Sequence, residues 1–180
     1  PLFLIVMSGR FTLSGGEPLM QDRFPVRLIT AAKEMGIHTA LDTNGYLGDR
    51  LSDCELKMID LVLLDLKAFD PEKHLKLTNK DNGPTLEFAR RLASNNRPIW
   101  VRYVLVPGLT DDPEDIRQIA DFAFGLGVVE RVEVLPFHQM GRFKWQRLNL
   151  DYKLNDVSPP SHALVEQTCE LFRAAGLTAH

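Results

Sequence analysis

The chain alternates short apolar runs with longer amphipathic runs, and this alternation restricts the fold more than any other feature of the sequence. The apolar runs are rich in Val, Ile and Leu and have the length of β-strands. Each is almost continuously apolar, as buried parallel strands are. We therefore predict an α/β domain of repeated βα units around a parallel sheet, open or closed. The predicted strands are 11–13, 39–41, 61–66, 99–106 and 132–135.

Four of the amphipathic runs predict helices. Residues 26–34 and 85–94 have apolar side chains at helical spacing, and the first of these runs is followed by Gly36, a residue suited to a helix C-terminus. Asp112 and Ser161 are side chains that cap helix N-termini, so we predict that two further helices begin after them. The helices fall between the strands, as βα units require.

Composition limits the classes of protein and partner. With 180 residues, 44% of them hydrophobic, the chain is expected to form one globular domain over residues 1–180. Its 21 basic and 24 acidic residues are scattered, so we expect no nucleic-acid partner. The apolar residues 1–7 are too few to span a bilayer and lack the flanks of a signal peptide, so we expect no membrane association. Two cysteines in the whole chain favour the cytoplasm.

Polar side chains lie at the end of almost every predicted strand. Because the carboxyl ends of parallel strands meet at one edge of a sheet, and ligands bind there, we expect these residues to form a cleft. In chain order they are Glu17, Asp42, Thr43, Asn44, Asp65, Lys67, Arg102 and His138.

Gly15 and Gly16 end the first strand and allow a ligand to approach the backbone without meeting a Cβ atom. Their carbonyl groups could accept hydrogen bonds from a ligand ammonium group, and Glu17 adds negative charge beside them. A tight turn between strand and helix would explain the same glycines without a ligand.

Asp65 and Lys67 are two residues apart, so an extended strand turns both side chains to one face. Lys67 could bind a ligand carboxylate and Asp65 an amine or hydroxyl group. Alternatively, the two side chains neutralise each other. Arg102 lies inside an apolar strand, where a guanidinium group needs an anion, either a ligand carboxylate or a neighbouring aspartate.

Asp42 and Thr43 offer oxygen atoms to a cation or to polar groups of a ligand, although an Asx turn over 42–45 would explain them equally well. His138 could stack on or hydrogen-bond to a ligand, whereas a lone histidine is more often structural. The other histidines have no metal-like spacing, and we expect them in surface or loop positions. They are His38, His74, His162 and His180.

Five strand-end motifs together resemble one family. They are Ser14-Gly15-Gly16-Glu17-Pro18, Leu41-Asp42-Thr43-Asn44-Gly45, Leu64-Asp65-Leu66-Lys67, the run 101–108, and the run 135–141. In this order they are similar to the motifs of radical S-adenosylmethionine (SAM) enzymes that activate glycyl radical enzymes. The runs 141–145 and 151–154 narrow the resemblance to the activating enzymes of pyruvate formate-lyase.

The resemblance implies a partial (β/α)6 barrel. It also implies a [4Fe–4S] cluster, held by a CxxxCxxC motif, that reduces SAM to methionine and a 5′-deoxyadenosyl radical, which removes a hydrogen atom from a glycine of pyruvate formate-lyase. Flavodoxin or ferredoxin would supply the electron. A monovalent cation is implied near Asp42 and Thr43. The implied SAM contacts are Gly15, Gly16, Glu17, Asp65, Leu66, Lys67, Arg102 and His138.

The cysteines do not match this chemistry. A cluster needs closely spaced thiolates, typically three or four, and Cys54 and Cys169 are far apart. In the family the cysteine motif follows the first strand, upstream of the matched region. We therefore expect an N-terminally truncated chain that lacks the first βα unit and is inactive alone.

Residues 141–160 have no obvious core pattern but mix cationic and aromatic side chains. Arg142, Lys144 and Trp145 suggest a docking surface for the partner protein, because Trp and Arg dominate interface energetics. An ordinary solvated loop is the alternative.

Two other classes of function are compatible with the residues. A lyase or aldolase barrel would use the amine of Lys67 to form an imine with a carbonyl substrate, which borohydride would trap. A non-catalytic module that binds SAM or a partner would need no cluster, and the missing cysteines support it.

Overall fold

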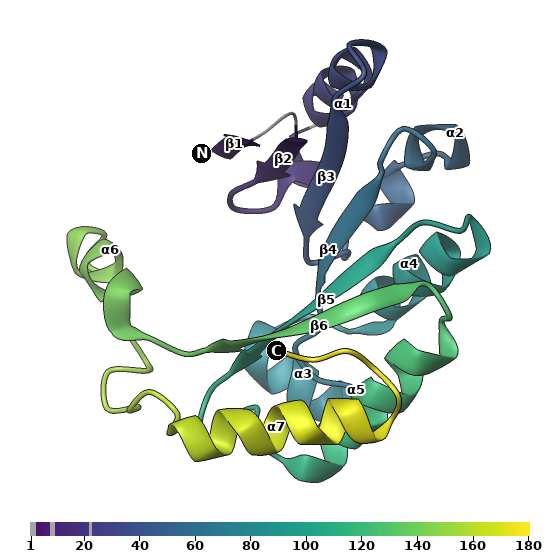
Figure 1. The fold of residues 1–180 in the computed structure, drawn as a ribbon. Coiled ribbons are helices and arrows are strands. Elements are labelled where there is room, and N and C mark those ends of the chain that lie inside the picture. Colours follow the sequence, from purple (N-terminus) through teal and green to yellow (C-terminus); the bar gives the residue numbers. More distant parts are fainter. Residues whose placement is uncertain (1–2, 8–9, 22) are drawn as a thin grey trace.

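The computed structural model describes residues 3–7, 10–21 and 23–180, and within them it forms one curved sheet with helices on its outer side (Figure 1). The strand order is β1-β2-β3-β4-β5-β6, which is also the order along the chain. β1 pairs antiparallel with β2, and every later pair is parallel. β1 and β6 form the two edges, so the sheet is the open, partial barrel that the resemblance implies. The strands are β1 (Phe3–Met7), β2 (Arg10–Ser14), β3 (His38–Thr43), β4 (Leu61–Asp65), β5 (Ile99–Leu105) and β6 (Val129–Pro136).

All four predicted helices are present. The Asp112 carboxylate accepts a hydrogen bond from the Glu114 amide at 2.9 Å, and the Ser161 hydroxyl accepts one from the Leu164 amide at 3.2 Å, so both residues cap as predicted. Among the described residues, no helix is long and apolar enough to cross a membrane. The helices are α1 (Phe24–Glu34), α2 (Asp53–Leu56), α3 (Pro71–Thr78), α4 (Gly83–Ser94), α5 (Pro113–Gly125), α6 (Arg142–Arg147) and α7 (His162–Ala174), and the 3-10 turns are η1 (Pro18–Met20), η2 (Gly48–Arg50) and η3 (Gln139–Gly141).

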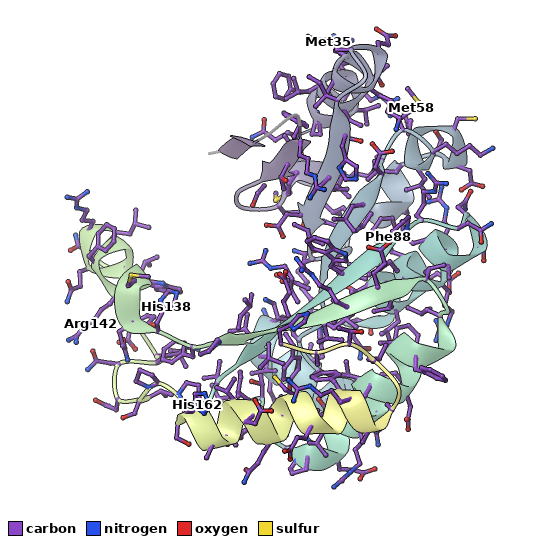
Figure 2. The ribbon with its side chains drawn as sticks, viewed as in Figure 1. Met35, Met58, Phe88, His138, Arg142 and His162 are labelled. Carbon is purple, nitrogen blue, oxygen red and sulfur yellow. The ribbon has the colours of Figure 1, made fainter. Side chains whose placement is uncertain are left out.

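Burial alternates along β2, β5 and β6, which corrects the expectation of continuous burial for these strands, whereas β3 and β4 contain consecutive buried residues. In β5, Ile99 and Val101 are completely buried against the helices, whereas Trp100 and Arg102 are half-buried on the opposite face. The concave face of the sheet is therefore free to carry polar groups. Met35, the apolar residue that follows α1, is 75% exposed at the outer end of the molecule (Figure 2).

The last residues of the chain cover the outer edge of β6. The amides of Val132 and Val134 donate to the carbonyls of Thr178 and His180 at 2.8 and 2.9 Å. The Arg173 guanidinium holds this segment through the Ala179 carbonyl at 2.8 Å. Exposed strand edges invite pairing with other chains, and here the described residues satisfy part of that edge.

Candidate functional site

The carboxyl ends of β2, β3 and β4 meet at one edge of the barrel, which we call the rim. At this rim lies a polar pocket of about 330 Å³. The predicted site residues that line it come from four successive strands, which is the convergence expected of a parallel sheet. The lining consists of Ser14, Gly15, Gly16, Asp42, Thr43, Asn44, Asp65, Lys67 and Arg102.

Arg102 is paired with an aspartate, one of the two anions considered for it. Its Nη1 donates to Asp42 Oδ1 at 2.7 Å, and Asp42 Oδ2 accepts a second hydrogen bond from the Ser14 hydroxyl at 2.6 Å. Burial on its own would lower the pKa of Arg102, but attraction to and hydrogen bonding with Asp42 raise it, with smaller contributions from Asp65 and Glu133. The guanidinium is therefore a fixed positive charge in the pocket.

Asp65 and Lys67 do lie on one face, and they form an ion pair with 3.0 Å between Nζ and Oδ2. Mutual neutralisation thus occurs, yet the Lys67 side chain remains 33% exposed and lines the pocket. An ammonium group has three N–H donors, and the bond to Asp65 uses one of them. The arrangement leaves Lys67 able to bind an anionic ligand group.

Gly15 and Gly16 adopt positive φ angles of 99° and 55°, so the tight turn considered for them is present. A Cβ atom added to Gly16 would meet nothing within 4 Å, which means that the backbone there faces open space. The turn and an accessible backbone occur together, because glycine tolerates a positive φ and has no Cβ atom to cover its peptide groups.

Glu17 holds the ends of β2 and β3 together. Its Oε1 accepts from the Thr43 hydroxyl at 2.7 Å and the Leu19 amide at 3.1 Å, and its Oε2 accepts from the Asn44 amide at 2.9 Å. Glu17 lines a second pocket of about 360 Å³ that shares Asn44, Asp65 and Lys67 with the first.

The side-chain oxygens proposed for a monovalent cation already make hydrogen bonds. Asp42 binds Arg102 and Ser14, and the Thr43 hydroxyl donates to Glu17. The Asx turn that was the alternative is formed by Asn44, whose Oδ1 accepts from the Tyr46 amide at 2.9 Å. In the described part of the chain, no three His, Cys, Asp or Glu side chains converge as a metal site. The cation remains a prediction.

Two predicted contacts lie elsewhere. His138 is exposed and accepts from the Met140 amide at 3.4 Å, and it lines neither pocket. After Pro136 the chain leaves the sheet, so His138 lies in the projecting stretch that leads into α6 (Figure 2). The Leu66 side chain is 3% exposed and belongs to the core, so only its backbone lies near the rim.

The expectation that His74 is a surface or loop residue was wrong. It lies in α3, is 6% exposed, and its Nδ1 is 2.8 Å from the Lys80 carbonyl. His74 also lines the second pocket. The sequence carried a signal for α3, because Asp70 followed by Pro71 is the same start that Asp112 and the next proline give to α5.

Residues 137–158, the projecting segment, are more ordered than a solvated loop. They contain η3 and the short helix α6, which the sequence did not predict. The rings of Trp145 and Tyr152 lie 5.8 Å apart, and Gln139 Nε2 donates to the carbonyls of Leu154 and Val157 at 2.8 and 2.9 Å. The side chain of Lys144 lies outside the described part of the structure. Apolar side chains at least 50% exposed on this segment are Met140, Phe143, Leu148 and Leu150.

The two cysteines of this chain do not fit an iron–sulfur cluster. Cys54 is exposed in α2, whereas Cys169 is buried in α7, where burial raises the pKa of its thiol. Cluster ligation requires neighbouring thiolates.

Known proteins match the chain over most of its length. Residues 6–123 match the family model described as the Radical SAM superfamily. The pyruvate formate-lyase-activating enzyme of Staphylococcus epidermidis is 44% identical over 165 residues, which are 88% of this chain and 66% of that protein. The pyruvate formate-lyase 1-activating enzyme of Escherichia coli K12 is 41% identical over 92% of this chain and 68% of its own length.

A solved structure agrees with the sequence matches. The crystal structure of a domain of pyruvate-formate lyase-activating enzyme from Bacteroides vulgatus has a TM-score of 0.76 and 26% identity, and covers 94% of this chain and 96% of that one. The present chain spans about two thirds of the length of the curated relatives it matches. The open, partial barrel, its strand-end motifs and these matches show that the chain belongs to the radical SAM superfamily and, within it, to the pyruvate formate-lyase-activating enzymes.

Proposed function

We propose that the protein containing this chain is a [formate-C-acetyltransferase]-activating enzyme, an oxidoreductase of the radical SAM type, and that the 330 Å³ pocket binds SAM. The observation that carries this proposal is the convergence of charged and glycine-rich strand ends on one pocket. SAM, when bound with a reduced [4Fe–4S] cluster, supplies a 5′-deoxyadenosyl radical to the reaction of this family, in which a glycine of pyruvate formate-lyase loses a hydrogen atom.

The residues of this chain have defined tasks in the proposed complex. The carbonyl groups of Gly15 and Gly16 accept from the methionyl ammonium group, and Lys67 binds the methionyl carboxylate. Arg102, fixed by Asp42, adds positive potential beside that carboxylate. We expect His138 to reach the adenosyl group only if the projecting segment moves toward the rim.

The remaining parts of the reaction lie outside the described contacts. We expect the three cluster cysteines to belong to a part of the protein other than these 180 residues. We expect flavodoxin or ferredoxin to deliver the electron. A reduced cluster requires a reducing compartment, so we expect the cytoplasm. The ion pair with Asp65 suits Lys67 to anion binding better than to amine attack, so we do not favour an imine-forming lyase.

Replacing Lys67 with Ala should weaken SAM binding about tenfold, since a hydrogen bond to a charged group contributes on the order of 1.5–3 kcal/mol. Titration calorimetry of the 180-residue chain would measure this. Binding by the unaltered chain should itself be weak, because a cluster normally holds the amine and carboxylate of SAM. Lys57→Ala, an exposed lysine outside the pocket, is the matched control and should bind like the unaltered chain. Equal SAM affinity of the Lys67→Ala and unaltered chains would remove Lys67 from the site.

We also propose that the projecting segment docks pyruvate formate-lyase through Arg142, Lys144 and Trp145. Its support is the exposed apolar surface on a segment that Gln139 and the Trp145–Tyr152 contact hold in shape. A protein substrate must be held with its glycine at the radical, so positioning is part of the chemistry.

In a full-length protein loaded with its cluster, Trp145→Ala should lower the glycyl-radical yield in the partner severalfold, because an interface aromatic contributes on the order of 1–2 kcal/mol. SAM cleavage without the partner should stay nearly unchanged. Electron paramagnetic resonance of the partner and chromatography of 5′-deoxyadenosine give the two readings. Leu148→Ala, on the same segment, separates general loss of apolar surface from a specific role of Trp145. Parallel loss of both readings would mean that Trp145 supports the barrel instead.

A further inference from the structure

The short loop that follows Lys67 is held by two buried polar side chains from distant parts of the chain. The first is Asp115, in the opening turn of α5, which is only 4% exposed. Its Oδ1 accepts hydrogen bonds from the backbone amides of Phe69 at 3.1 Å and Asp70 at 2.8 Å. Two consecutive peptide groups of the loop thus depend on one carboxylate.

The second side chain is Asn82, which directly precedes α4 and is also 4% exposed. Its Nδ2 donates to the Phe69 carbonyl at 2.7 Å and lies 3.4 Å from the Ala68 carbonyl. Asp115 therefore binds the amides of this loop, while Asn82 binds its carbonyls. The two together fix residues 68–70 from both sides.

On the other side of Lys67 the backbone is fixed by the sheet, because the Leu66 amide donates to the Arg102 carbonyl at 3.1 Å. The side chains of Leu66 and Ala68 are 3% and 5% exposed. Lys67 therefore lies between two anchored and buried neighbours, and its side chain reaches the pocket. The direction of its Cα–Cβ bond follows from these anchors.

Asp115 is not needed to cap α5, since Asp112 already caps that helix. Burying a carboxylate costs free energy unless it is hydrogen-bonded. For Asp115 this cost is offset by the hydrogen bonds from the loop amides and by its position in the first turn of a helix, where a negative charge is stabilised. The contacts of Asp115 that bridge separate elements go to the loop after Lys67.

We propose that Asp115 and Asn82 are positioning residues that orient Lys67 toward the rim pocket and thereby set its affinity for the carboxylate of an amino-acid-type ligand such as SAM. The inference rests on the proposed function, because it assigns the orientation of a residue in that same site. It adds two residues that contact no ligand themselves.

A double-mutant comparison tests the inference in the 180-residue chain, with SAM titrations followed by the shifts of backbone amide NMR signals. Asp115→Ala and Asn82→Ala should each weaken SAM binding about tenfold, the scale of a lost charged hydrogen bond. In the Lys67→Ala background neither change should weaken binding further, because both act through Lys67. Asp121→Ala, an exposed aspartate of the same helix, should have no effect. Equal losses of affinity with and without Lys67 would overturn the inference and make the two residues merely structural.

Asp115→Asn keeps an oxygen for the two loop amides and should recover most of the affinity, which also covers the case in which Asp115→Ala unfolds. A second reading does not depend on SAM. After reductive ¹³C-methylation, the NMR signal of Lys67 should move toward those of exposed lysines in Asp115→Ala or Asn82→Ala. An unchanged Lys67 signal in both folded variants would refute the positioning role. Absence of SAM binding by the unaltered chain, with a shifted Lys67 signal, would instead refute only the proposed function.

Discussion

The 180-residue chain, treated anaerobically with iron and sulfide, should acquire no stoichiometric [4Fe–4S] cluster and should cleave no SAM. Three or four neighbouring thiolates are required, whereas Cys54 lies exposed in α2 and Cys169 is buried as a thiol of raised pKa in α7. Iron analysis and chromatography of 5′-deoxyadenosine would measure both outcomes. We expect SAM cleavage to be absent rather than merely slower.

The Staphylococcus epidermidis relative, prepared in the same way, is the positive control for reconstitution. Joining a segment that carries a CxxxCxxC motif ahead of residue 1 should restore cluster binding if the rim of this chain can accommodate the cluster. Stoichiometric cluster iron together with reductive SAM cleavage by the printed chain would contradict the prediction.

Replacing Gly48 with Ala should destabilise the fold by about 3 kcal/mol, the upper range for adding a methyl group to a packed core. A Cβ atom at Gly48 would lie 2.1 Å from Cδ2 and 2.3 Å from Cγ of Phe88. Phe88, labelled in Figure 2, is 2% exposed and lies in α4, and its own Cβ would be 2.8 Å from the added atom, so turning the ring does not remove the clash. Calorimetry should show a melting temperature roughly 10 °C lower, by the usual scaling for a chain of this size.

Gly125→Ala is the matched control, because a Cβ atom there meets nothing within 4 Å. It lies at the end of α5, where alanine favours the helix, so its melting temperature should be unchanged or slightly higher. If the melting temperatures of Gly48→Ala and Gly125→Ala were equal, the tight contact with Phe88 would not limit stability.

Most of the fold could be predicted from the sequence because periodicity and caps are local signals. The five parallel strands and four long helices were all identified, and Asp112 and Ser161 were correct as caps. β1, α2, α3 and α6 were missed. The apolar run that forms β1 was considered only as a membrane span or signal peptide, and its antiparallel pairing with β2 is not a local signal; α2 and α6 have only four and six residues.

The site was predictable only as far as strand ends determine it. Parallel strands bring their carboxyl ends to one rim, so Asp42, Asp65 and Arg102 could be expected together. The direction in which the chain leaves β6 depends on packing of the projecting segment, and this separates His138 from the pocket. Asp115 and Asn82 could not be found at all, because their partners lie 46 and 13 residues away in sequence.

The hydrogen bonds at the rim also determine its balance of charge. In the lining of the 330 Å³ pocket, two carboxylates, Asp42 and Asp65, meet two cations, Lys67 and Arg102, so the lining has no formal net charge. SAM carries an ammonium, a carboxylate and a sulfonium group, and so has one net positive charge. A ligand of this kind can enter by exchanging ion-pair partners, its ammonium group replacing a cation beside an aspartate and its carboxylate replacing an aspartate beside a cation, without any residue gaining or losing a proton. The sulfonium group would then have no counter-charge among these four side chains, so the occupied pocket would carry one positive charge overall.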